Sequence, residues 1–456
     1  MNAVNHTPQD KASVLDRLKK LAVTGSLLSI FGFGSIMLMR LGGNVIVAGW
    51  LYPEAFGLMA VVNALMMGLA MFSDVGLRPS IVQNKRGEEA DFLRTAWTIQ
   101  VARGFILALF SVGLAFPIAA INNEPQLIPL IIVTGLSSIF MGFNSTYLFV
   151  YSRHLELRNM VILDIIAAFL STAVMLIWAY FYPTIWALVS SAFVNAIVRL
   201  VASHTVLAGK VPMRFAWEKQ SVHELIHFGK WIFISTALGF LLMRLDVFVL
   251  GSIAGMATLG LYSIAKTLSR ISIEALMKLS DMVMFPLYSR LKEQGADTLR
   301  EKMFKARALL LALFLPPLWL LILDGQWIVD LLYDDRYQFA GWILQVLAAG
   351  ATATVIITSI YPVLLAVGDS FRNMLNSITR FIMQVLGMVI GYYLGGVEGF
   401  IIGVAMGDLF TYVVLVFLIR PYNVWFPWLD FAAFASSFAV IWLAFVANVG
   451  ILSWIA

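Results

Sequence analysis

The chain has 456 residues, of which 61% are hydrophobic and 12% charged, and its formal net charge is +5. Together with a mean hydropathy of +0.87, this composition excludes the soluble globular classes and is typical of a polytopic helical membrane protein. The absence of cysteine excludes disulfides and thiolate sites, and because basic residues of membrane proteins gather in cytoplasmic loops, we expect no nucleic-acid partner.

The chain begins with a polar tail of mixed charge, 1–21, and the apolar run that follows is too long for a cleaved signal peptide. Apolar runs of about twenty residues, the length that crosses the hydrocarbon core, then recur to the C-terminus. They predict an all-α membrane protein with thirteen spans, and the pattern is also compatible with twelve or fourteen. The predicted spans are 22–50, 54–76, 94–120, 127–150, 159–182, 184–207, 228–252, 257–288, 306–333, 339–366, 372–394, 397–419 and 429–456.

A polar segment divides these spans into two sets of six. The sequence therefore predicts an N-terminal six-helix bundle at 22–207, a linker at 208–227, a C-terminal six-helix bundle at 228–420 and an extra helix within 421–456. No connection between the spans is long enough to hold a further domain on the side opposite the N-terminus.

Lysine and arginine are distributed unevenly between the two sides of the predicted bundles. More than two thirds of the 31 fall in the tail and in connections on its side, whereas Arg336 alone falls on the other side. The positive-inside rule then places the N-terminus and the linker in the cytoplasm. Because both bundles start inside and contain an even number of helices, we expect a parallel repeat around a central cavity.

The two predicted bundles share a short motif that contains an intramembrane arginine. Leu38–Leu41 and Leu242–Leu245 both read Leu-Met-Arg-Leu. An ionisable group at bilayer depth costs about 3 kcal/mol even on lenient insertion scales, so such a group is a candidate functional residue. We expect Arg40 and Arg244 to face each other across the cavity. Gly42 and Gly43 follow Arg40 directly and are predicted to form a hinge, with close helix packing as the alternative.

The span at 257–288 carries a stripe of charge. Lys266, Arg270, Glu274 and Lys278 recur every four residues and Asp281 follows, so they share one helix face. The stripe predicts either the lining of a water-filled cavity or an intrahelical ladder of ion pairs. Arginine forks suit phosphate oxygens, so the cationic set predicts a phosphate or diphosphate ligand. The predicted substrate-binding residues are Arg40, Arg244, Lys266 and Arg270, and the candidates for coupling to a proton or sodium ion are Asp246, Glu274 and Asp281.

One motif favours a different chemistry. His223, Glu224 and His227 form an H-E-x-x-H pattern, the signature of zinc proteases, and Asp324 with Gly325 would extend it to an intramembrane metalloprotease. However, the pattern lies in the predicted basic linker, and no histidine follows His227. We therefore interpret the two histidines as surface residues and expect neither a metal nor another cofactor.

Six further motifs are distributed from the end of the first span to the eighth. They are Tyr52–Leu58, Ser73–Leu77, His227–Trp231, Asp246–Gly251, Leu259–Tyr262 and Phe285–Arg290. They resemble the oligosaccharide flippases of the polysaccharide transporter (Wzx-like) family, within the multidrug/oligosaccharidyl-lipid/polysaccharide exporter superfamily. The resemblance implies two six-helix bundles, a V-shaped cavity and alternating access. It also implies that an undecaprenyl-diphosphate oligosaccharide is flipped to the outer leaflet of a bacterial inner membrane for polysaccharide export.

Three other functions stay open at this point. A multidrug exporter of the same superfold would need an acidic cavity for organic cations, and the predicted cavity is basic. A glycan polymerase or ligase would need a large outer loop, and the third alternative is the metalloprotease. We expect a transporter rather than an enzyme. Its expected partners are the lipid-linked oligosaccharide, membrane lipids, a proton or sodium counter-ion, and polymerase or export machinery.

Overall fold

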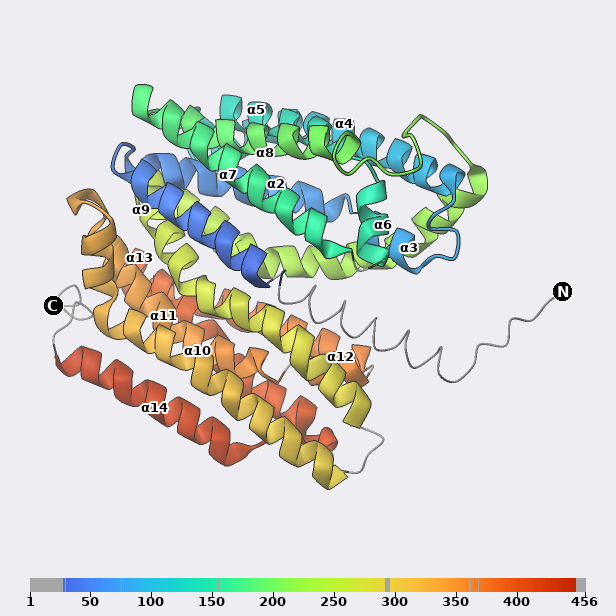
Figure 1. Ribbon diagram of the computed structural model, residues 1–456. Coiled ribbons are helices and arrows are strands. Elements are labelled where there is room, and N and C mark those ends of the chain that lie inside the picture. The colour runs from blue at the N-terminus through green and yellow to red at the C-terminus, as the bar shows by residue number, and fades with distance from the viewer. Residues whose placement is uncertain are drawn as a thin grey trace. The chain divides into compact units, whose positions relative to one another are not determined.

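The computed structural model describes residues 28, 30–74, 76–154, 156–291, 296–360, 362–367 and 369–447 (Figure 1). Within these ranges, the side chains of 157, 226–238, 241, 242, 281–291, 296–299, 365–367 and 370 lie outside the description. Every regular element in these ranges is a helix. The all-α prediction is therefore confirmed.

The helices follow one another with short connections. The first is Ile30–Ala48. It is followed by α2 (Pro53–Phe72), α3 (Leu77–Gln83), α4 (Ala90–Ile121), α5 (Leu127–Gly142), α6 (Tyr147–Arg153), α7 (Leu157–Phe181), α8 (Trp186–His204), α9 (Lys219–Leu291), α10 (Ala296–Leu332), the 3-10 helix η1 (Asp335–Tyr337), α11 (Phe339–Thr358), α12 (Pro362–Val367), α13 (Ser370–Ile419), η2 (Arg420–Tyr422) and α14 (Pro427–Val446).

Ten helices of the described part are long and apolar enough to cross a membrane, or up to 11 if the bent pair α5 and α6 is one span. Two of them contain a break where the sequence predicts the end of one span and the start of the next. Helix α9 is kinked at Gly255, which has a φ of 77°, and α13 at Gly395 and Gly396. Glycine adopts such positive φ values without steric cost because it has no Cβ. The protein is therefore a multi-pass membrane protein. In the described part, most predicted spans coincide with one helix or with one side of such a kink, whereas 127–150 covers α5 and α6 and 339–366 covers α11 and α12.

The chain forms two compact units. Unit 1 comprises the described residues of Met1–Leu51 and Leu65–Ala237, and unit 2 comprises those of Tyr52–Ala64 and Leu238–Ala456. The division therefore falls inside α2 and inside α9, and the predicted domain limits stay predictions.

In unit 1, α4 packs on α5, α5 on α8, and α7 on α8. The helix Ile30–Ala48 packs along α7 through two glycines. Gly32 contacts Val161, and a Cβ on Gly43 would lie 2.6 Å from Cγ2 of Thr172. Small residues let membrane helices approach closely, which explains why this pair of helices can pack without large interlocking side chains.

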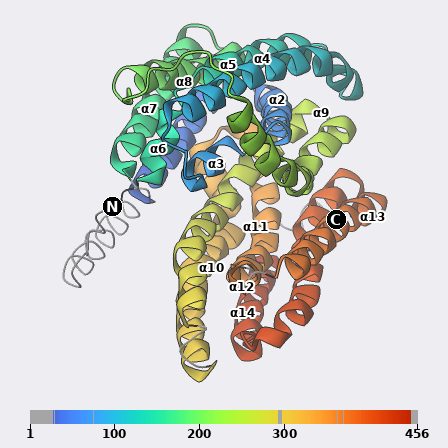
Figure 2. The ribbon, with the colours of Figure 1, turned by 90° about the vertical axis from the view of Figure 1, so that its right-hand side faces the viewer.

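In unit 2, α11 packs on α10, α13 and α14, and α14 also packs on α10, as the two views show (Figure 2). The two sides of the α13 kink pack on each other through glycines, Gly387 against Gly403 and Gly391 against Gly399. Helix α14 is joined to α10 by an ion pair between Arg307 and Asp430, whose side chains are only 1% and 2% exposed. The extra C-terminal helix is thus an integral part of unit 2.

A second glycine contact in unit 2 joins α2 to α9. A Cβ on Gly57 would overlap the carbonyl group of Met256, and a Cβ on Gly260 would overlap that of Pro53. Gly57 and Gly260 are the central residues of the two similar motifs Phe56–Leu58 and Leu259–Leu261. The repeated motif therefore places both of its glycines at one helix crossing.

Candidate functional site

The charged stripe of α9 is joined to the Leu-Met-Arg-Leu motif across the kink at Gly255. Asp246, which precedes the kink, accepts hydrogen bonds from the hydroxyl of Tyr262 and the ammonium of Lys266, which both follow it. Asp246 and Tyr262 are buried, and the Lys266 side chain is 15% exposed. The Lys266 ammonium also lies 5.5 Å from the centre of the Tyr262 ring. The positive charge of Lys266 is thus balanced by a carboxylate of the same helix.

Two arginines complete this cluster. Arg244 is half-buried and interacts electrostatically with Asp246, Arg270 and Glu274. Nε of Arg270 lies 3.8 Å from Oε1 of Glu274, and these side chains are 29% and 41% exposed. Three of the four predicted substrate-binding residues therefore come together in unit 2. With Lys278, which interacts electrostatically with Glu274, four cations lie near two carboxylates.

The contacts within the stripe fit the ion-pair ladder in part, and the lining of a water-filled cavity stays a prediction. The Arg270–Glu274 contact joins residues four apart on one helix, as an ion-pair ladder requires. In contrast, Lys266 pairs outside its own turn, and the cluster keeps an excess of positive charge. The third coupling candidate, Asp281, has its side chain outside the described part, so its role stays a prediction.

The fourth predicted binding residue, Arg40, belongs to unit 1. It is exposed on the helix Ile30–Ala48 and interacts electrostatically with Asp164 of α7. Asp164 in turn accepts a hydrogen bond from Arg199 of α8, whose Nη2 lies 2.6 Å from its Oδ1. The expectation that Arg40 faces Arg244 stays a prediction.

The predicted hinge residues lie within an unbroken helix. Residues 30–48 are continuously helical through Gly42 and Gly43. A Cβ on Gly43 would crowd Thr172 and Met175 of α7, whereas one on Gly42 would meet nothing within 4 Å. The packing of Gly43 favours the alternative that this glycine allows helices to approach, and motion at these positions stays a prediction.

Sequence reasoning assigned no role to Asp164, Arg199 or Tyr262. For Asp164 and Arg199 a signal was present, because each is an ionisable residue inside a predicted span. Tyr262 gave no such signal, since tyrosine is common in membrane helices and only the folded chain places its hydroxyl on Asp246.

Glu224 of the H-E-x-x-H pattern is held by residues of the connection between α3 and α4. It accepts hydrogen bonds from Nδ2 of Asn84 at 2.6 Å and from Arg86, which also binds Glu218. The hydrogen bond from Asn84 is the main cause that keeps the pKa of Glu224 below its usual value. His223 is exposed, and the side chain of His227 lies outside the described part. Among the described side chains, no group of three or more His, Cys, Asp or Glu is placed to hold a metal.

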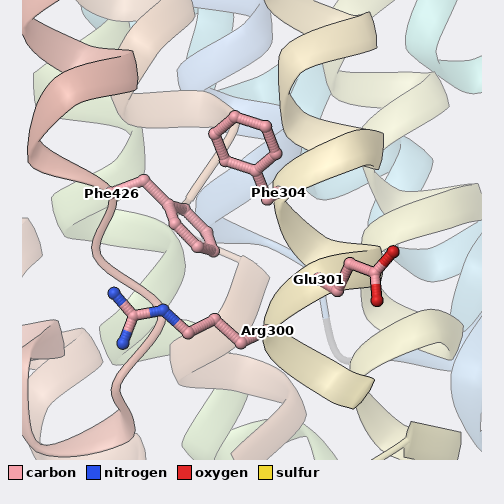
Figure 3. A pocket seen from close by; sticks show the side chains of 4 residues that line it. All are labelled: Arg300, Glu301, Phe304 and Phe426. Atoms are coloured by element: carbon pink, nitrogen blue, oxygen red, sulfur yellow. The ribbon is translucent and has the colours of Figure 1, made fainter. Parts of the chain in front are cut away.

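A shallow pocket in unit 2 is lined by none of the charged residues described above (Figure 3). It has a volume of about 370 Å³ and is lined by Arg300, Glu301, Phe304 and Phe426. The guanidinium of Arg300 lies 5.6 Å from the centre of the Phe426 ring and donates to Asn423 at 2.6 Å. None of the predicted site residues lines this pocket.

Comparison with known proteins identifies relatives over most of the chain. A family model described as "Polysaccharide biosynthesis protein" matches residues 46–340. The lipopolysaccharide biosynthesis protein WzxC of Escherichia coli K12 is 21% identical over 410 residues, which is 89% of this chain and 82% of WzxC. The succinoglycan biosynthesis transport protein ExoT of Rhizobium meliloti is 24% identical over 327 residues, 71% of this chain and 65% of ExoT.

Among solved structures, the lipid II flippase MurJ in an inward closed conformation is similar, with a TM-score of 0.72. The match covers 93% of both chains at 12% sequence identity. At this identity the likeness shows a common fold. It confirms the predicted fold class.

Proposed function

Because this chain belongs to the polysaccharide biosynthesis protein family, we propose that it is a flippase for lipid-linked oligosaccharides. The substrate is a repeat unit on undecaprenyl diphosphate, and alternating access moves it from the cytoplasmic to the outer leaflet of a bacterial inner membrane. The observation that carries this proposal is the membrane-embedded cationic cluster around Arg244, Lys266 and Arg270, in a chain whose relatives are named for polysaccharide biosynthesis and transport.

The cluster can supply the hydrogen bonds and the opposite charge that a diphosphate loses when it leaves water. A charged group is costly at bilayer depth unless it finds a partner of opposite charge. Arg244 and Arg270 can each present a planar fork to phosphate oxygens, which accept two parallel hydrogen bonds from it. Lys266 is engaged by Asp246, so it contributes to the field of the site and becomes a direct ligand only if that pair opens. We place Arg40 in the same role for unit 1.

The direction of transport has an electrostatic cause. A cytoplasm-negative potential favours outward movement of a negative headgroup by about 2.3 kcal/mol per charge per 100 mV. A proton or sodium ion that couples through Asp246 has to replace the ammonium of Lys266, whereas Glu274 is more accessible at 41% exposure. We therefore prefer Glu274 over Asp246 as the coupling carboxylate. We propose that the N-terminus lies in the cytoplasm. Polymerase or export machinery would then receive the flipped lipid-linked oligosaccharide in the outer leaflet.

The test is leaflet-resolved transport of a fluorescent polyprenyl-diphosphate glycan in proteoliposomes. We expect Arg40→Ala and Arg244→Ala each to slow transport at least about tenfold, since each removes a charged hydrogen-bond donor. Arg244→Lys should restore part of the rate. Arg300→Ala, which changes an arginine of the shallow pocket, is the matched control and should transport normally.

Two outcomes would contradict the proposal. Normal transport by both Arg40→Ala and Arg244→Ala would show that the cationic mechanism is wrong. An inactive parent protein that instead transports an organic cation, such as a fluorescent dye, would indicate a drug exporter of the same fold.

A further inference from the structure

The shallow pocket of unit 2 combines one arginine with two aromatic rings at the start of α10 and α14 (Figure 3). Cζ of Arg300 lies 5.6 Å from the centre of the Phe426 ring. The rings of Phe304 and Phe426 meet edge to face, with their centres 5.4 Å apart. Phe304 is 43% exposed, so apolar surface is open beside the guanidinium. The pocket therefore presents a cation and an apolar wall to the same ligand.

The guanidinium of Arg300 is held in place by one hydrogen bond and keeps further donors. Its Nη1 donates to Oδ1 of Asn423 at 2.6 Å, and Asn423 follows η2 with a left-handed φ of 55°. Among the described residues, no carboxylate forms an ion pair with Arg300. Because a guanidinium has five N–H donors in a fixed fork, the remaining ones can bind the oxygens of an anion.

Glu301 also lines the pocket, but it does not neutralise the arginine. Its Oε1 accepts a hydrogen bond from Nζ of Lys305 at 2.6 Å. Figure 3 shows the carboxylate of Glu301 pointing away from the guanidinium of Arg300. Lys302, on the same turn of α10, is exposed and adds a further positive charge. The start of α10 therefore keeps an excess of positive charge, which is complementary to an anion.

The pocket lies where two membrane-spanning segments begin. The candidate span of α10 starts at Arg300, and that of α14 starts at Pro427, directly after Phe426. Side chains at the ends of such segments meet the headgroups and the upper acyl chains of lipids. These ends of the two helices are on the predicted cytoplasmic side, and basic pockets between membrane helices on that side bind anionic headgroups.

We propose that this pocket binds an anionic phospholipid of the cytoplasmic leaflet. Its phosphate accepts hydrogen bonds from Arg300, and the upper part of an acyl chain packs on Phe304 and Phe426. The lipid thereby joins the start of α10 to the start of α14 and stabilises unit 2. This site is separate from the proposed transport function, because none of the predicted substrate-binding residues lines the pocket.

The experiment follows thermal unfolding of the full-length protein in detergent during titration with a phospholipid. Dioleoyl phosphatidylglycerol is compared with dioleoyl phosphatidylcholine, which has the same chains and no net charge. We expect phosphatidylglycerol to raise the unfolding midpoint more than phosphatidylcholine does. Arg300→Ala should weaken the apparent affinity for phosphatidylglycerol about tenfold, because it removes a charged hydrogen-bond donor. Arg300→Lys should recover part of this affinity, since it keeps the charge without the fork.

Two further variants test the apolar wall and the specificity of the effect. Phe304→Ala keeps the cation and removes one ring, so it should also bind phosphatidylglycerol more weakly than the parent. Arg336→Ala is the matched control, because Arg336 likewise lies over an aromatic ring, at 4.8 Å from the centre of Tyr52, but is paired with Asp334. It should keep the full response to phosphatidylglycerol. Each variant is compared with itself in phosphatidylcholine, so a change in its basal stability does not enter the result.

Three outcomes would overturn the proposal. An Arg300→Ala variant with the response of the parent would show that the lipid binds elsewhere, and so would an unchanged Phe304→Ala variant if Arg300→Ala fails to fold. Equal midpoints of the parent in the two lipids would contradict the requirement for negative charge. An equal shift with glycerol 3-phosphate, a headgroup without chains, would indicate a site for soluble anions. Transport by the control Arg300→Ala is measured in phosphatidylcholine vesicles, which contain no anionic lipid.

Discussion

The crossing of Gly57 and Gly260 permits a prediction whose sign can be derived from the structure. A Cβ on Gly57 would lie 2.8 Å from the carbonyl carbon of Met256 and 3.0 Å from the amide nitrogen of Gly260. These neighbours are backbone atoms, so no side chain can rotate away and the helices themselves have to separate. We expect Gly57→Ala to destabilise the protein.

Two opposing effects set the magnitude. Replacing a glycine inside a helix by alanine stabilises by about 0.5–1 kcal/mol, because alanine loses less conformational entropy. Forcing one extra carbon into a packed contact costs about 1–3 kcal/mol. The net effect of Gly57→Ala is then a loss of up to about 2.5 kcal/mol. Gly42→Ala is the matched control, since its Cβ would meet nothing within 4 Å and only the stabilising effect remains.

The assay is thermal unfolding of the purified variants in one detergent, followed by intrinsic fluorescence. Gly57→Ala should lower the midpoint and Gly42→Ala should leave it unchanged or raise it. Gly260→Ala should resemble Gly57→Ala, and the double variant should cost less than the two changes added, because both carbons enter the same crossing. An unchanged midpoint for both Gly57→Ala and Gly260→Ala would refute the close packing on which this reasoning depends.

Three further predictions concern charged groups. Asp246→Asn should lower the free energy of unfolding by about 3–5 kcal/mol, and with it the unfolding midpoint, because it leaves the largely covered Lys266 ammonium without its carboxylate partner. Replacing Lys266 by Met in the same chain should recover part of the loss. Asp430→Asn should cost a similar amount, since the guanidinium that it binds is 1% exposed, and recovery of the parent midpoint would contradict this role. The hydrogen bond from Asn84 lowers the pKa of Glu224, so its contribution to stability is present above the unfolded pKa of about 4.5 and is lost as the pH falls through the lower folded pKa. Glu224→Gln should therefore flatten the acid end of the stability–pH curve, and an unchanged curve would contradict the assignment.

The local sequence determined the membrane class and the helices. Apolar runs of spanning length are a property of the residues themselves, because any backbone in lipid has to satisfy its own hydrogen bonds. The two kinks follow in the same way, since Gly255 and Gly396 adopt positive φ values that few other residues accept. The four-residue spacing of Lys266, Arg270 and Glu274 likewise determined that these side chains share one helix face.

Only the tertiary structure decided which charges meet. Helical periodicity indicates that Arg244 and Asp246 point apart, but it contains no information that Lys266 and Tyr262, beyond a kink, bind Asp246. In the same way, Asp164 and Arg199 are adjacent only because α7 packs on α8. A glycine is also ambiguous in sequence, since Gly42 is open and Gly43 is packed although they are neighbours. These differences arise from contacts between distant segments, and local propensity and spacing do not encode such contacts.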